Sequence, residues 1–581
     1  MKKIFFLIAA LAAFAQSQAC TNLIVGKKAS ADGSVMCSYS ADSYGMFIGL
    51  CHYPAAKHSA GEMRKIYDWD TNRYWGEIPE AAETYNVIGN INEWQVAIGE
   101  TTYGGREEMV DTTGIIDYGS LIYIALQRSR TAREAIRVMT KLVETYGYNS
   151  EGETFTICDP DEAWIMEMQG ACPDAGKQGG KDGRQAASKK SKTSGSKVVW
   201  VARRIPDDCI CAHANQSRIR EIPQSGKKYD KKEGWWTVGD DVIYSRNCIT
   251  YARQQGWFSG DDAQFSWADA YCPADFSGRR YCDARAWSLF NRFSDDFSAY
   301  LPWALGKDPD AKPMPLWIKP NRKVSVHDVE MAMRDHYEGT PLSVVKDDDP
   351  GKGLYDMPYR PTPLSFTVDG KKYFNERPIS TQQSGFTFVA QLRSWLPREV
   401  GGVLWFGNDD ANMVAFTPVY CSMIQQPECY NTPGADATHF SMDNAYWVCN
   451  WVSNMVYPRY SMLFPAVETL RNTLDSTYQA RQQQVEEHAQ QTLKAKGSEA
   501  CAAELNRYSV DCAQQMLAKW KDLATYLIVK YNDMAVKPEK DGQFELTPEG
   551  LGATVKRPGY NPSAAKAVSQ YRDGWYAVPE Q

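Results

Sequence analysis

The sequence predicts an α+β fold with a long helical section near its C-terminal end. Strand-like runs separated by turn signals fill much of the first half of the chain, which is typical of antiparallel hairpins. Residues 463–532 are instead rich in Gln, Ala, Leu and Glu and contain no proline after Pro465, which is typical of long helices. With 581 residues, the chain is long enough for more than one domain.

The first nineteen residues are typical of an export signal. Two lysines begin it, an apolar run follows over residues 4–14, and Ser17 and Ala19 place small side chains at the −3 and −1 positions of a cut before Cys20. The apolar run is shorter than the roughly 20 residues that span a bilayer. No later segment has the length and apolar content of a transmembrane helix. We therefore expect an extracytoplasmic protein, periplasmic or secreted, that begins at Cys20.

Strands are predicted directly after Cys20. Residues 21–26 (TNLIVG) form an apolar run, Asp32-Gly33 is a hairpin turn signal, and residues 35–39 would be the return strand. Residues 94–101 (WQVAIGET) predict a further strand.

Two helices and a second hairpin follow. Residues 121–126 and 132–143 carry apolar side chains at helical spacing, with Thr131 as the expected N-cap. Strands are expected over residues 154–158 and 163–168, because the sequence DPDE between them has the chemistry of a turn.

Residues 174–197 differ from the rest of the chain. They contain no aromatic or large aliphatic side chain and are rich in Gly, Ser and Lys. Such a segment cannot bury enough apolar surface to offset the entropy lost on ordering. It is predicted to be a mobile basic loop that ends where a strand resumes at residues 197–203; contact with an anionic surface is the alternative role.

The second half of the chain predicts short strands and then long helices. Short strands are predicted over residues 386–392, 402–406 and 413–418. Two long helices are predicted within residues 463–532, separated at the sequence KGS over residues 496–498, and the tail after Asp533 is expected to be irregular. The predicted organisation is a signal over residues 1–19, a core over 20–457 and a helical C-terminal section with its tail over 458–581.

Composition argues against several classes of function. The net charge is −7, so there is no basic excess of the kind that nucleic acid partners require. No array of the CxxC…CxxC or HExxH type indicates zinc. Of the 15 cysteines, those other than Cys20 are even in number, and an oxidising compartment would allow them to pair. Spacing alone does not settle the pairing, and the close-spaced candidates are Cys272 with Cys282, Cys421 with Cys429, and Cys501 with Cys512.

Cys20 is the residue that most directly indicates chemistry, and its position has three interpretations. A cysteine exposed by cleavage can be an N-terminal nucleophile, whose thiol attacks an amide while its own α-amine, of pKa about 7.7–8.0, takes the proton. It can instead be the lipidated cysteine of a bacterial lipoprotein, although such signals usually have Leu or a similar residue where this chain has Ser17. An ordinary disulfide partner is the third interpretation.

Several separated segments carry a resemblance to a known family. The string CTNLIVGKKASADGS, which begins at Cys20, closely resembles the mature start of peptidase family C69 dipeptidases. These enzymes belong to the N-terminal-nucleophile superfamily and are distant relatives of penicillin V acylases and bile salt hydrolases. Further segments that are similar to the family, in the same order, are NEWQVAIGETT at 92–102, DPDEAWIME at 159–167, WVARRIPDDCICAHANQSRI at 200–219, MAMRDHYEGTPL at 331–342, RPIS at 377–380 and residues 444–458.

The resemblance implies a fold and an activity. The implied fold is a four-layer αββα N-terminal-nucleophile hydrolase sandwich, in which helices cover two facing antiparallel sheets, with the long helical C-terminal section packed on it. The implied activity is an exported cysteine dipeptidase that hydrolyses short unblocked peptides with Cys20 and needs no metal or organic cofactor. By resemblance, the amides of Asn92 and Asn215 would stabilise the oxyanion, and Asp42 would fix the amine of Cys20.

The chain departs from this family at one position. Many members carry an Arg where this chain has Tyr39. An Arg there would lower the thiol pKa and could pair with a substrate carboxylate. Arg218 and Arg285 are the residues that could supply this charge for substrate binding. His213 would share a strand face with Asn215, but a lone histidine is more often structural.

Three alternatives to the dipeptidase remain open from the sequence. The first is an N-acyl amide hydrolase of the penicillin V acylase or bile salt hydrolase type. The second is a surface-anchored binding protein that is lipidated at Cys20. The third is a catalytically inactive family member, which the change to Tyr39 suggests.

Overall fold

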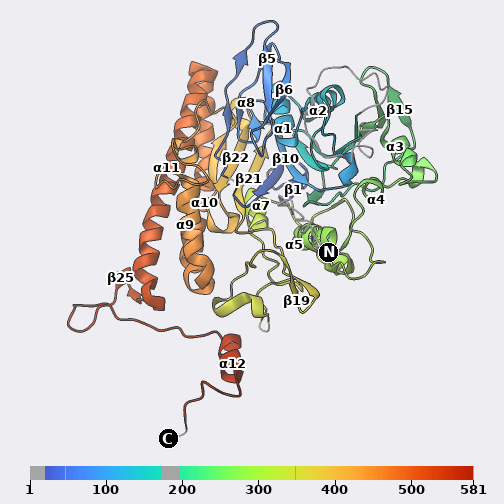
Figure 1. The fold of residues 1–581 in the computed structure, drawn as a ribbon. Helices are drawn as coiled ribbons and strands as arrows, with labels where there is room; N and C mark the ends of the chain where they lie inside the picture. The colour runs from blue at the N-terminus through green and yellow to red at the C-terminus, as the bar shows by residue number, and fades with distance from the viewer. Residues whose placement is uncertain (1–19, 46, 172–196, 347–348, 580–581) are drawn as a thin grey trace, which may run out of the picture.

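The computed structural model describes residues 20–45, 47–171, 197–346 and 349–579 (Figure 1). The export signal predicted over residues 1–19 therefore lies outside the described residues. The loop predicted over residues 174–197 also lies outside them, except for Lys197. Within them, two large antiparallel sheets are combined with twelve α-helices, of which the longest form a C-terminal helical part. This confirms the predicted α+β class and the helical C-terminal section.

The first sheet has seven strands and contains the strand that follows Cys20. In spatial order its strands are β18 (Trp317–Ile318), β14 (Ile210–His213), β1 (Asn22–Val25), β2 (Val35–Asp42), β21 (Ser384–Leu392), β22 (Gly402–Asn408) and β23 (Thr417–Tyr420). The first predicted hairpin is confirmed, because Ile24 of β1 pairs with Cys37 of β2. The prediction of a strand over residues 413–418 is wrong at its start, because β23 begins only at Thr417. Asp410 accepts a hydrogen bond from the backbone of Asn412 and caps a 3₁₀ turn before the strand.

The second sheet has ten strands. In spatial order they are β15 (Lys227–Asp230), β16 (Trp235–Val238), β17 (Val242–Ser245), β13 (Val198–Arg204), β12 (Ala163–Gly170), β11 (Glu153–Cys158), β10 (Ala97–Thr102), β9 (Ile91–Asn92), β8 (Val87–Ile88) and β3 (His52–Tyr53). The hairpin predicted at the DPDE turn is confirmed, because β11 and β12 pair with Cys158 opposite Ala163.

The two sheets face each other and meet closely beside the strand that follows Cys20. His213 of β14 hydrogen-bonds Thr101 of β10 (2.8 Å) and Thr156 of β11 (2.7 Å), and so joins one sheet to the other. A Cβ atom on Gly99 of β10 would lie 2.5 Å from Oδ1 of Asn22, so glycine permits this close approach. The contact places the end of β10 next to the start of β1.

Two helices cover the other face of the ten-stranded sheet. They are α1 (Tyr118–Arg128) and α2 (Ala132–Tyr146), and their apolar side chains share a core with Ile98 of β10 and Trp164 of β12. Both helices were predicted, and the predicted cap of α2 is confirmed because the Thr131 side chain accepts a hydrogen bond from the backbone of Glu134.

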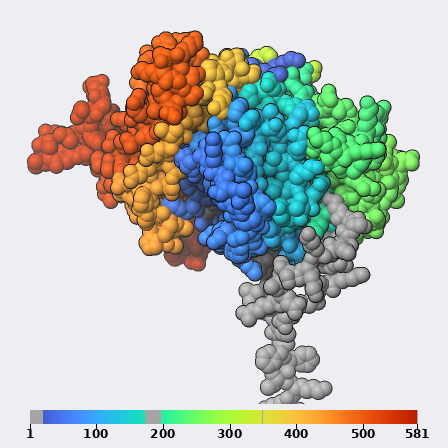
Figure 2. All heavy atoms as spheres, turned by 90° about the horizontal axis from the view of Figure 1, so that it is seen from above, coloured from blue at the N-terminus to red at the C-terminus, as the bar shows by residue number. Residues whose placement is uncertain are grey.

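The C-terminal helices cover one flank of the seven-stranded sheet. They are α9 (Ala445–Val456), α10 (Tyr460–Lys496) and α11 (Ser498–Tyr531), and the predicted break between the two long ones lies at Gly497, with φ of 84°. Arg393, which directly follows β21, makes a two-bond ion pair with Glu486 of α10 (2.7 and 2.6 Å). From above, these helices (orange) lie on one side of the blue and cyan strands and helices, with the green segments on the opposite side (Figure 2).

Smaller elements complete the described chain. The remaining helices are α3 (Cys248–Gln254), α4 (Trp267–Tyr271), α5 (Ala284–Arg292), α6 (Leu301–Leu305), α7 (Val326–Met333), α8 (Arg398–Gly401) and α12 (Pro562–Gln570). Four two-stranded sheets pair β4 (Ala56–Lys57) with β7 (Glu83–Thr84), β5 (Met63–Tyr67) with β6 (Tyr74–Pro79), β19 (Ser365–Val368) with β20 (Lys371–Phe374), and β24 (Glu539–Lys540) with β25 (Gln543–Phe544). In the described ranges, no helix has the length and apolar character needed to cross a membrane.

The cysteines do not pair as the sequence suggested. Every cysteine in the described part of the chain is a free thiol, including the three close-spaced candidate pairs. For Cys501 and Cys512 the reason is geometric. Both lie on α11, where eleven residues of helix correspond to roughly 16 Å along the axis. This separation is far beyond the reach of a disulfide.

Candidate active site

Cys20 is held at the end of the seven-stranded sheet. It is only 1% exposed and lies two residues before the start of β1. Thr21 exchanges backbone hydrogen bonds with Ser40 of β2 (3.4 and 3.0 Å), and Asn22 pairs with His213 of β14. The strands on both sides of β1 therefore fix the backbone of Cys20.

Asn215 directly contacts Cys20. It lies two residues beyond β14 with φ of 55°, in the left-handed region that asparagine tolerates better than most residues. Its Oδ1 accepts a hydrogen bond from the backbone nitrogen of Cys20 (2.8 Å), and its Nδ2 donates one to the carbonyl of Thr102 (2.6 Å). The structure thus brings Asn215 to the nitrogen that would become the amine after cleavage.

Arg285 clamps this arrangement from α5. Its Nη1 donates to the carbonyl of Cys20 (2.6 Å) and to Oγ1 of Thr21 (2.8 Å). Its Nη2 donates to Oδ1 of Asn215 (2.8 Å) and to the carbonyl of Ala214 (3.3 Å). Its Nε donates to the carbonyl of Tyr281 (2.7 Å). All five N–H groups are therefore used within the protein. Arg285 thus positions Cys20 and Asn215, and its role in binding substrate stays a prediction.

Asp42, at the end of β2, lies beside the thiol and is fully buried. Its carboxylate accepts hydrogen bonds from Arg377 (2.8 Å) and from Oγ of Ser384 (2.6 Å). The negative charge of Asp42 raises the pKa of the Cys20 thiol, whereas a hydrogen bond from the Asp42 backbone lowers it. Asp42 thus lies near the Cys20 thiol, whereas the backbone nitrogen of Cys20 bonds Asn215, so the role of Asp42 in fixing the amine stays a prediction.

Glu100 of β10 is a site residue that the sequence analysis missed. Its Oε1 accepts hydrogen bonds from the Tyr39 hydroxyl and, at 3.4 Å, from the Cys20 thiol. Burial is the main cause that raises the thiol pKa well above its usual value, and the charge of Glu100 is the second. The thiol is therefore protonated at rest, and attack requires a base. A lone charged residue inside the otherwise uncharged strand AIGETT was the signal that could have identified it.

Glu153 of β11 adds a second carboxyl group to this region. It is fully buried, and Thr102 donates a hydrogen bond to its Oε2 (3.0 Å). Burial, followed by the charge of Glu100, raises the pKa of Glu153 well above its usual range. Burial also raises the pKa of Glu100. The two carboxyl groups and Cys20 thus form one weakly ionised cluster.

Asn92 is not brought to Cys20. Its Nδ2 donates to the carbonyls of Leu126 (2.7 Å) and Ser129 (2.8 Å), while its Oδ1 accepts from the backbone of Trp94 (2.9 Å) and Val96 (3.0 Å). Its polar groups are therefore engaged in joining the turn before β10 to the end of α1. The geometry does not support the predicted oxyanion role, and assigns Asn92 to the turn instead.

Arg218 and His213 also bond other residues of the chain rather than Cys20. Arg218 is buried and pairs with Asp283 (3.2 Å), and it donates to the carbonyl of Pro315 (2.8 Å). The geometry therefore does not support its predicted role in substrate binding. Burial lowers the pKa of His213 to about 3, so this residue is a neutral link between the two sheets, as the sequence favoured.

A small cavity adjoins the Cys20 cluster through Tyr39. It is lined mainly by aromatic and aliphatic side chains, among them Ala41, Trp69, Tyr118, Ile122 and Phe386. Its volume of about 20 Å³ leaves room for about one water molecule.

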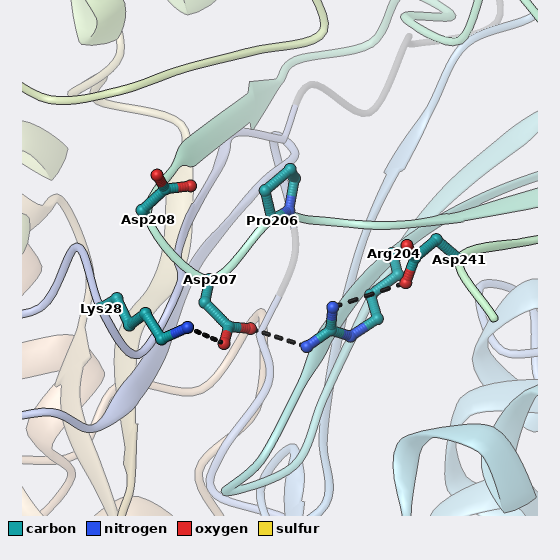
Figure 3. A pocket seen from close by; sticks show the side chains of 6 residues that line it. All are labelled: Lys28, Arg204, Pro206, Asp207, Asp208 and Asp241. Atoms are coloured by element: carbon teal, nitrogen blue, oxygen red, sulfur yellow. Dashed lines mark hydrogen bonds and ion pairs between the residues drawn. The ribbon is translucent and has the colours of Figure 1, made fainter. Parts of the chain in front are cut away.

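A larger cavity of about 320 Å³ lies at the opposite end of β1 (Figure 3). It is lined by Lys28, Arg204, Pro206, Asp207, Asp208 and Asp241. Asp207 pairs with both Lys28 (3.4 Å) and Arg204 (2.6 Å), so the two cations are already neutralised. Among the described residues, no Cys, Ser or Thr lines this cavity. In the part of the chain that the structure describes, no group of three or more His, Cys, Asp or Glu side chains is placed to hold a metal ion.

Comparison with known proteins identifies the family of this chain. The model of peptidase family C69 matches residues 19–49 and 50–473. A probable dipeptidase of Salmonella dublin is 24% identical over 445 residues, which are 73% of this chain and 86% of that protein. Dipeptidase A of Lactobacillus helveticus is 25% identical over 452 residues, 74% of this chain and 80% of that protein. Because the family model matches most of its length, the chain belongs to peptidase family C69.

Proposed function

We propose that the mature protein is an exported cysteine dipeptidase with Cys20 as its N-terminal residue and nucleophile. Membership of family C69 and the dipeptidase names of its relatives support the reaction. The observation that carries the proposal is the hydrogen bond from the backbone nitrogen of Cys20 to Asn215. A polar partner thus holds the atom that cleavage after Ala19 would turn into an amine.

The chemistry follows from these contacts. After cleavage, the α-amine of Cys20 takes the thiol proton, and the thiolate attacks the scissile carbonyl carbon to form a tetrahedral oxyanion. Nδ2 of Asn215 and the backbone N–H of Asp42 are the candidate donors to that oxyanion. The protonated amine then donates its proton to the leaving nitrogen as the C–N bond breaks. Water hydrolyses the resulting thioester and restores the thiol.

We infer that the fold is the αββα sandwich of N-terminal-nucleophile hydrolases. Two antiparallel sheets linked face to face by His213, with α1 and α2 over one and α9 to α11 over the other, support this assignment. In such a sandwich the first residue of a central strand lies at the end of the sheet. Cys20 has this position relative to β1.

The first test is the mass of the N-terminal peptide of the protein secreted by its native host. A peptide that begins at unmodified Cys20 is the expected result. Lipid or any acyl group on its amine would remove the base and indicate the surface-anchored alternative. A different first residue would remove the nucleophile.

The second test is hydrolysis of a panel of dipeptides and of N-acyl amides. We expect turnover of dipeptides by the mature protein and none by Cys20→Ala. The matched control is Cys248→Ala, which removes a buried thiol on α3 and should leave turnover unchanged. Turnover of N-acyl amides alone would favour an acylase, and turnover by Cys20→Ala would exclude the mechanism.

A further inference from the structure

We propose that Glu100, with Glu153 behind it, is the subsite that binds the positively charged α-amino group of an unblocked peptide. This inference rests on the proposed dipeptidase function and deepens it, because it names the group by which the site recognises its substrate. It also states which compounds the site rejects, namely peptides and amides whose amino group is acylated.

The position of Glu100 fits this role. Its Oε1 lies 3.4 Å from Sγ of Cys20. In a peptide attacked at its first amide bond, the α-nitrogen lies only about 2.5 Å from the carbonyl carbon, given standard backbone dimensions. When that carbon is at an attack distance of about 3–3.5 Å from the sulfur, the α-nitrogen must lie within a few ångströms of the thiol. A carboxylate beside the sulfur is therefore within reach of the ammonium group.

The two carboxyl groups of this site have no cationic partner within the described ranges. Among the described residues, neither Glu100 nor Glu153 forms an ion pair with a Lys, Arg or His. Oε2 of Glu100 and Oε1 of Glu153 are buried and have no donor other than the hydrogen bond that the two carboxyl groups make with each other. Two such groups in a desolvated place cannot both ionise without a cation. An entering ammonium group supplies that cation.

The enzyme's own groups do not fill this role. The nitrogen of Cys20 is directed to Oδ1 of Asn215, where the Arg285 guanidinium also lies, and not to Glu100. Tyr39 donates a neutral hydroxyl to Glu100, so it orients the carboxylate without cancelling its charge.

The kinetic test compares one dipeptide with its N-acetylated form. For the wild type we expect kcat/KM to favour the free amine by at least ~100-fold, because an acylated amine leaves the buried carboxyl groups without a partner. For Glu100→Gln we expect kcat/KM on the free dipeptide to fall by about 10–100-fold and the preference to shrink accordingly. The matched control is Glu330→Gln, which changes a buried glutamate on α7 that bonds Gln479 and should keep the wild-type preference.

Two outcomes would overturn the inference. One is a wild type that hydrolyses both forms equally well. The other is a Glu100→Gln variant that loses activity on both forms by the same factor, since Glu100 would then act only on the thiol.

A binding measurement keeps the inference testable if Glu100→Gln does not fold. Calorimetry on mature Cys20→Ala protein should show that the free dipeptide binds at least ~10-fold more tightly than the N-acetylated one. Equal affinity refutes the subsite. Preferential binding by Cys20→Ala, combined with a wild type that hydrolyses no dipeptide, would refute the proposed function and retain the subsite.

Discussion

Replacement of Arg285 by lysine tests the clamp that holds Cys20 to Asn215. The guanidinium makes five hydrogen bonds, four of which go to residues 20, 21, 214 and 215. A lysine has at most three N–H groups on one atom and cannot span these acceptors. The loss of two charge-assisted hydrogen bonds, each of about 1.5–3 kcal/mol, predicts a fall in the free energy of unfolding of about 3–6 kcal/mol.

Activity should fall for a separate reason. Without the clamp, the amine and the thiol of Cys20 are free to move relative to Asn215, and a misplacement of about 1 Å costs roughly 100-fold in rate. The assay is kcat/KM on a dipeptide at a temperature where urea titration shows the variant to be folded. Arg334→Lys is the control, because Arg334 is equally buried and bonds the carbonyl of Ala411 (3.0 Å) and Asp475 (2.8 Å) outside the site. We expect Arg334→Lys to lose stability but not kcat/KM; wild-type kcat/KM in Arg285→Lys would refute the reasoning.

Three further predictions follow from the same geometry. Asn92→Ala should lower the free energy of unfolding by about 1–3 kcal/mol, because it unpairs two buried carbonyls, but should leave kcat/KM of the folded variant unchanged; a 100-fold loss of kcat/KM would restore its catalytic role. His213 has a pKa near 3 in the folded state and about 6.5 when unfolded, so its stabilisation is complete above pH 6.5 and is lost as the pH falls toward 3. Urea titrations at pH 7 and pH 5 should therefore show the wild type losing about 2 kcal/mol more than His213→Gln, and equal losses would contradict the neutral histidine. In the uncleaved chain, the rate at which iodoacetamide alkylates Cys20 can be followed by mass spectrometry. This rate should still rise above pH 9, because burial, Glu100 and Asp42 raise the pKa of the thiol. A plateau of the rate below pH 9 would mean that the thiol is not desolvated.

Local sequence determined most of the secondary structure. The hairpins at residues 21–39 and 154–168, both helices with their Thr131 cap and the break at Gly497 were predictable, because turn chemistry, side-chain periodicity and capping act over a few residues. The family resemblance also identified Cys20, Asp42 and Asn215, which the fold brings together although they are far apart in the chain.

The partners of these residues were decided only by tertiary structure. Strand alternation places Glu100 on the face of β10 shared with Ile98, away from the face on which Thr101 meets the other sheet. That pattern alone would separate Glu100 from Cys20, yet the two are in contact. The partners of Asn92 and Arg285 were likewise not predictable from the sequence. A buried amide or guanidinium forms hydrogen bonds with the polar groups that the tertiary structure places next to it. The sequence determined which groups are available for chemistry, and the packing of the two sheets decided which of them meet at Cys20.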